Sequence, residues 1–94
     1  MSADANRLSD DDRARVRRAV GSLYAKWAAS SLGGIGTASR VAAVSRRPEN
    51  AETARRVAYG SIGCVAADLR ESELEEIDGI LADVRDDPRC WRFS

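Results

Sequence analysis

The residues of this sequence whose types could support catalysis or hold a metal ion are two cysteines and a group of carboxylates. The chain has no histidine, which removes the commonest general base and the usual zinc ligand. Cys64 and Cys90 alone cannot supply the four ligands of a structural zinc site. The GSIG segment at 60–63 lacks both the spacing and the preceding strand of a nucleophile elbow. The sequence therefore predicts a protein that is not an enzyme and that holds neither a metal nor another cofactor.

The two cysteines have different neighbours along the chain. Cys64 lies within an uncharged stretch at 57–67, which predicts a buried and inert thiol. Cys90 has Arg89 and Arg92 beside it, and their positive charges would favour a thiolate. The sequence leaves open whether Cys90 is reactive.

Carboxylates crowd the segment 73–78, at Glu73, Glu75, Glu76 and Asp78. On a helix these side chains mostly point to different sides, whereas the carboxylates of an acid–base pair converge in a cleft. The spacing of a calcium-binding loop is also absent. These residues therefore predict a solvated helix face.

A glycine-rich segment at 33–36 is the feature closest to a phosphate-binding loop. It runs into the expected start of a helix at Thr37, with Arg40 one turn further on, and exposed amides at a helix N-terminus bind anions. The segment lacks the lysine and the spacing of a P-loop. We interpret Gly33–Gly36 as a connector, and the sequence leaves open whether it binds an anion.

Basic residues between 37 and 56 accompany a short pattern typical of DNA-binding domains. TASRV at 37–41 is followed by Pro48 and then by ETARRV at 52–57. With gaps, and over about a fifth of the chain, this resembles the DNA-binding headpiece of LacI-type repressors, where a TVSRV recognition helix precedes a proline and an ETxxRV helix. The resemblance implies major-groove contacts by Thr37, Ser39 and Arg40, with Arg46 and Arg47 near phosphates.

The net charge of zero hides an uneven distribution of charge along the chain. Positions 13–56 hold ten basic residues and two acidic ones, whereas positions 68–87 hold nine acidic residues and two arginines. The two halves should attract one another, either within one chain or between copies. The acidic half and the zero net charge argue against DNA binding, which is therefore the alternative function.

Four helices are expected from the spacing of apolar residues and from start and stop signals. The expected ranges are about 10–30, 37–46, 51–71 and 73–87. Ser9 should cap the first helix, and Pro48 should end the second. Asn50 should cap the third, and Ser72 with Glu75 should form a capping box at the start of the fourth. The first helix has apolar residues at 16, 20, 23, 24 and 27, and the fourth at 74, 77, 81 and 84.

The expected third helix is unusual because eleven consecutive residues, 57–67, carry no charge. A helix that is apolar all round is normally buried on most sides, so this helix should be central to the fold. The residues expected to be almost fully buried are Val57, Cys64, Val65 and Leu69. A second face of small residues, where another backbone can approach closely, would hold Gly60, Gly63 and Ala67.

Together these features predict an all-α fold, with one domain spanning 1–94. It should be a small four-helix bundle with a short C-terminal tail packed back on it. We expect a non-catalytic protein–protein interaction module, such as an accessory subunit, an adaptor or a small homodimer. The interface candidates are Tyr59, Gly60, Gly63, Ala67, Trp91 and Phe93.

The sequence also favours a location inside a bacterial cell. No apolar run reaches the length of a membrane span, and the charged N-terminal stretch lacks the apolar segment of a secretory signal. Fourteen arginines against one lysine suggest a GC-rich bacterial genome. We expect a cytoplasmic protein with reduced thiols and no membrane partner.

Overall fold

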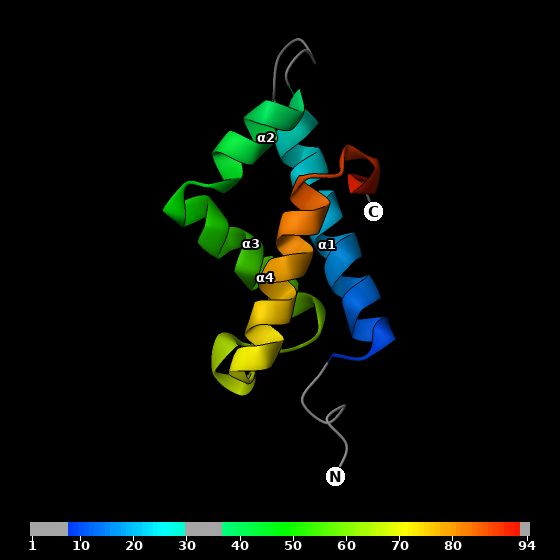
Figure 1. Ribbon diagram of the computed structural model, residues 1–94, viewed down its shortest axis with the longest axis vertical. Helices are drawn as coiled ribbons and strands as arrows, with labels where there is room; N and C mark the ends of the chain where they lie inside the picture. The colour runs from blue at the N-terminus through cyan, green and yellow to red at the C-terminus, as the bar shows by residue number, and fades with distance from the viewer. Residues whose placement is uncertain (1–7, 30–36, 93–94) are drawn as a thin grey trace.

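The computed structural model describes residues 8–29 and 37–92, and all regular structure within them is helical (Figure 1). The α-helices are α1 (Asp10–Ala29), α2 (Thr37–Ser45), α3 (Pro48–Ser61) and α4 (Glu71–Arg85). Two short 3-10 turns, η2 (Ala66–Asp68) and η3 (Pro88–Cys90), flank α4. The four helices contact one another, and no strand occurs in the described ranges. This confirms the predicted all-α fold of four helices.

The helix α1 begins where its sequence signals predict. The Ser9 hydroxyl accepts a hydrogen bond from the backbone N–H of Asp12 at 3.0 Å, and three aspartates fill the first turn, where the helix dipole favours negative charge. Val16, Val20 and Tyr24 are buried on one side of this helix. Its apolar stripe is therefore the one expected from the spacing.

Around this stripe, α1 and α4 run in the same direction (Figure 1). The helix α3 runs in roughly the opposite direction, from the end of α2 towards the segment that leads into α4. The helix α2 crosses one end of the molecule, and α1 contacts each of the other helices. The core joins the α1 stripe to Val41 of α2, Ala54 and Ala58 of α3, and Ile77 and Val84 of α4. Each helix thus contributes small or β-branched side chains to one shared core.

The third helix begins earlier than expected. It starts at Pro48 instead of 51, because proline is well suited to the first turn of a helix, where its missing N–H has no intrahelical partner to lose. The prediction that Asn50 caps this helix is wrong. The Asn50 amide instead donates to the Val44 carbonyl oxygen at 2.9 Å, so it satisfies an acceptor near the end of α2.

The third helix also ends ten residues earlier than the expected range of 51–71. Gly63 has a φ of 71°, the left-handed conformation that glycine adopts without strain. The N–H of Cys64 donates to the Tyr59 carbonyl at 2.9 Å, and the N–H of Gly63 donates to the Gly60 carbonyl at 3.1 Å. These two bonds form a Schellman motif, which ends α3 at Ser61.

The early end of α3 overturns the expected burial of the segment that follows. Val65 is 61% exposed, whereas Val57, Cys64 and Leu69 are only half-buried. Residues 64–70 form an irregular connection that contains η2. The prediction of a central, enclosed third helix is wrong for this part of the chain.

The start of α4 is shifted from its predicted position by two residues. The backbone N–H of Arg70 donates to the Glu73 carboxylate at 2.9 Å, so the residue before the helix is Arg70 and the capping box expected from Ser72 and Glu75 is wrong. The expected apolar side is confirmed: Ile77, Leu81 and Val84 are buried, and Leu74 packs against the core.

The C-terminal tail packs back on the bundle as far as the structure describes it. The Trp91 indole N–H donates to the Val84 carbonyl oxygen at 2.7 Å. The Trp91 ring packs edge-on against the Tyr24 ring, with 6.4 Å between the two ring centroids. The Cys90 carbonyl oxygen lies where a side chain on Gly21 would begin, so α1 needs a glycine at this contact. Phe93 lies outside the described residues.

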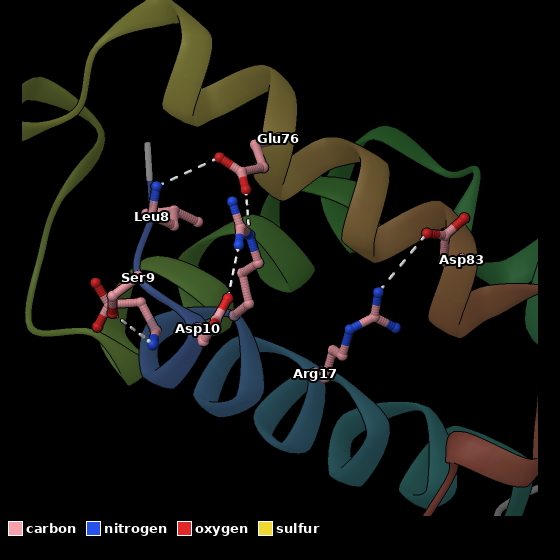
Figure 2. Close-up of polar contacts among 8 residues, drawn as sticks. Leu8, Ser9, Asp10, Arg17, Glu76 and Asp83 are labelled. Carbon is pink, nitrogen blue, oxygen red and sulfur yellow. Dashed lines mark hydrogen bonds and ion pairs between the residues drawn. The ribbon is translucent and has the colours of Figure 1, made fainter. Parts of the chain in front are cut away.

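Three ion pairs join the basic first half of the chain to the acidic α4. Arg13 and Arg17 of α1 pair with Glu76 and Asp83, the second pair at 3.9 Å (Figure 2). On the other flank, Arg55 of α3 pairs with Asp78 at 3.1 Å. The Glu76 carboxylate also accepts the backbone N–H of Leu8 at 3.4 Å. The attraction expected between the two halves thus acts within the chain.

The contact between α1 and the tail can be tested with two glycine-to-alanine variants. Gly21→Ala should lower the free energy of unfolding and change the near-UV circular dichroism of the tryptophans, because the new methyl group collides with the Cys90 carbonyl. Gly79→Ala is the control. A side chain at this exposed position in α4 meets nothing within 4 Å, so alanine should stabilise the protein by about 1 kcal/mol. Equal stabilisation by both variants in urea titrations would contradict the contact.

Candidate functional site

The predicted interface residues do not form one surface. Tyr59 and Gly60 lie together in the last turn of α3. Gly63 lies in the turn that ends the helix, and Ala67 lies in η2, so the predicted helical face of small residues does not exist. Trp91 is turned towards Tyr24 and Val84 in the core.

Tyr59 and Gly60 do line an open groove between α3 and the segment that follows it. We call this the α3 groove; its volume is about 730 Å³. Its apolar and small lining residues include Pro48, Ala51, Tyr59, Gly60, Cys64 and Val65. Its charged lining residues are Glu52, Arg55 and Arg56. The early end of α3 creates this groove, because residues 64–66 turn back beside the helix instead of extending it.

The charges of the α3 groove are balanced by close partners. Arg56 and Glu52, one helical turn apart, form an ion pair at 2.7 Å, and their side chains are 75% and 62% exposed. Arg55 pairs with Asp78 outside the groove, and the hydrogen bond raises the pKa of Arg55 above its usual value. Burial raises the pKa of Tyr59, so its hydroxyl is neutral at physiological pH. The groove therefore offers apolar surface with paired charges along its rim.

Neither cysteine is fully buried. Cys64 is half-buried in the wall of the groove, with its sulfur 3.5 Å from the Ile62 carbonyl oxygen, so the predicted burial of this thiol is wrong. Cys90, the last residue of η3, is also half-buried. Both thiols are free. Within residues 8–29 and 37–92, no group of three cysteine, aspartate and glutamate side chains is arranged to hold a metal ion.

The candidate DNA-contacting residues lie at the end of the molecule occupied by α2. The side chains of Ser39, Arg40, Arg46 and Arg47 are exposed there, whereas α4 begins at the opposite end (Figure 1). Acids also lie near this basic end, at Glu49 in the first turn of α3 and at Asp86 and Asp87 after α4. The hydrogen bond from Arg85 lowers the pKa of Asp86, and the charge of Arg46 adds to the effect. Thr37 begins α2, while its side chain and residues 33–36 lie outside the described part of the chain.

The groove was not predicted from the sequence, because Gly63 was placed on a helical face of small residues. A glycine just past the last turn is a common helix stop, and this signal would have placed the end of α3 near Ser61. The uncharged run then has a second interpretation, as one wall of a binding surface. The Glu52–Arg56 spacing of four residues was visible in the sequence as a helical ion pair.

The chain matches no protein-family model, no curated protein and no solved structure. Among the helices that the structure describes, none is long and apolar enough to cross a membrane.

The groove depends on the turn at Gly63, and alanine substitutions can test this. Gly63→Ala should destabilise the protein by roughly 1–2 kcal/mol, because a side chain is strained in the left-handed conformation. Gly60→Ala, within the helix and with open space around the new methyl group, should stabilise it by up to about 1 kcal/mol. If α3 instead continued to 71, both variants would be stabilising in denaturant titrations.

Proposed function

We propose that this protein is a non-catalytic protein–protein interaction module that binds its partner in the α3 groove. The observation that carries the proposal is the exposure of Val65 beside a mostly apolar groove. Among the described residues, Val65 is the large apolar side chain that remains exposed. Exposed apolar surface with a polar rim is typical of protein-binding sites.

The chemistry of the groove supports binding rather than catalysis. A general acid or base needs a pKa near the working pH and a proton to exchange with a substrate. The groove's arginines are held in ion pairs and its tyrosine is kept neutral. Such groups can orient a partner along the rim while the apolar lining provides the contact area.

The shape of the groove favours an elongated partner segment. It follows α3 from Pro48 to Gly60, a distance of about 18 Å at the helical rise per residue. Helices bind in such grooves through side chains spaced along one face. Gly60 leaves one end of the groove open, because a side chain built there would meet nothing within 4 Å.

The proposal can be tested by filling the groove without disturbing the core. Gly60→Arg places a large side chain in open space, and Gly79→Arg on α4 is the matched control, since it also meets no neighbour. Tagged wild-type and variant proteins are compared for bound proteins, and any partner is then purified and titrated. We expect Gly60→Arg to weaken binding roughly tenfold or more and Gly79→Arg to leave it unchanged. Equal binding by the two folded variants would contradict the proposal.

DNA binding is a second candidate, supported by the position of the basic end. Arg40, Arg46 and Arg47 are exposed around α2, while Glu73 and Glu76 lie near the start of α4 at the far end. Glu76 is also neutralised by Arg13. This arrangement keeps the glutamates at the start of α4 away from the basic end, where their charge would repel the phosphates of a duplex. Fewer carboxylates lie close to the basic end itself: Glu49 in the first turn of α3, and Asp86 and Asp87 after α4.

The DNA candidate predicts a steep dependence on salt. Titration with duplex DNA should show affinity falling log-linearly with salt concentration, and Arg40→Ala should remove most of the sequence preference. Arg18→Ala, on the exposed side of α1, is the control and should have little effect. Absence of binding at low salt would exclude this candidate.

A further inference from the structure

We propose that the occupant of the α3 groove is a second copy of the same chain, which presents its own α3 to the groove. The two chains would pair about a two-fold axis with their α3 helices antiparallel. This inference rests on the proposed function and names its partner. A two-fold interface requires a surface that is complementary to itself, and the order of charged and apolar residues along the groove meets this requirement.

The charges along α3 are self-complementary about the level of Ala54. Glu52 lies two residues before this level and Arg56 lies two residues after it. When a second α3 runs antiparallel across this level, Glu52 of each copy faces Arg56 of the other. If the register is slightly shifted, Glu52 lies opposite Arg55 instead. Glu52 therefore faces an arginine in either register.

The exposed state of these two side chains allows them to exchange partners. Glu52 and Arg56 are 62% and 75% exposed, and an exposed ion pair within one helix contributes little stability. Re-pairing across the interface therefore gives up little. The same two ion pairs would then form in a partly desolvated setting, where charges interact more strongly.

The apolar surface follows the same symmetry. Pro48 and Gly60 lie at equal distances along the helix on either side of Ala54, and Val65, which follows the end of α3 in the chain, lines the same groove. The antiparallel arrangement brings the exposed Val65 of each copy to the Pro48–Ala51 end of the other. Gly60 leaves room for this approach, since the space beside it is open.

The charge balance of the groove distinguishes a second copy from a strongly charged partner. An acidic or basic segment binds best to a rim of the opposite sign. Here Arg56 is matched by Glu52, and Arg55 by Asp78, so neither sign dominates. A partner with the same alternation of charge fits this rim, and the chain itself carries that alternation.

Charge reversal with mixing tests the pairing directly. In a dimer of the Glu52→Arg chain, arginines at positions 52 and 56 face one another across the interface. In a dimer of the Arg56→Glu chain, glutamates face one another at the same positions. By sedimentation equilibrium, wild type should be a dimer. Each variant alone should show a dissociation constant raised roughly tenfold or more. An equimolar mixture of the two variants should regain dimers, because each remaining contact then joins opposite charges.

The mixture separates pairing between copies from pairing within one helix. Both variants lose the same intrachain ion pair, so only contacts between copies can restore association. Arg18→Glu on α1 is the control and should stay dimeric. If charge reversal lowers the helix content, Glu52→Gln and Arg56→Gln replace it. Each should weaken the dimer, and mixing them should restore it only in part, because the mixed dimer regains one of the two Glu52–Arg56 contacts.

The inference is overturned if wild type is monomeric at the highest soluble concentration, if the variants associate as strongly as wild type, or if the mixture stays dissociated. None of these results decides the proposed function. That depends on whether Gly60→Arg loses a partner that Gly79→Arg retains.

Discussion

The burial of Val16, Val20 and Tyr24 along one side of α1 is the interaction on which the other elements depend. The helices α2, α3 and α4 and the turn η3 all contact α1, and Val16 and Val20 are completely inaccessible to solvent. Full burial of a side chain of this size contributes about 1.5–3 kcal/mol. In a chain this short, one shared stripe organises the whole core. What does not fit around that stripe, including residues 64–66, stays at the surface.

Ion pairs join α4 to α1 on one side and to α3 on the other. The ion pairs Arg13–Glu76 and Arg17–Asp83 lie on the α1 side, and Arg55–Asp78 lies on the α3 side. Each pair is at least partly exposed and stabilises the fold only modestly. Their main consequence is for the surface: they occupy Arg55 and part of the acidic helix, and they leave the Glu52–Arg56 pair to define the rim of the α3 groove.

The sequence predicts α1 and α4 well because each combines a regular apolar spacing with acids near its start. It fails between 57 and 70, where the uncharged run at 57–67 fits a buried helix and an exposed surface equally well. Gly63 decides between them, because its left-handed backbone conformation ends α3. Tyr59 and Gly60 do line the α3 groove, but Gly63 and Ala67 do not lie with them on one helical face. The contact between Gly21 and Cys90 carries no local signal, since it joins residues far apart in the chain.

In the proposed dimer, the exposed wall of the α3 groove is where a second copy binds. Isotope-filtered nuclear Overhauser spectra of a mixed labelled and unlabelled sample test it most directly, because they report only contacts between copies. We expect contacts from the Val65 methyl groups of one copy to the Pro48 and Ala51 side chains of the other. A dimer whose intermolecular contacts come from α2 or α4, with none from Val65, would contradict it.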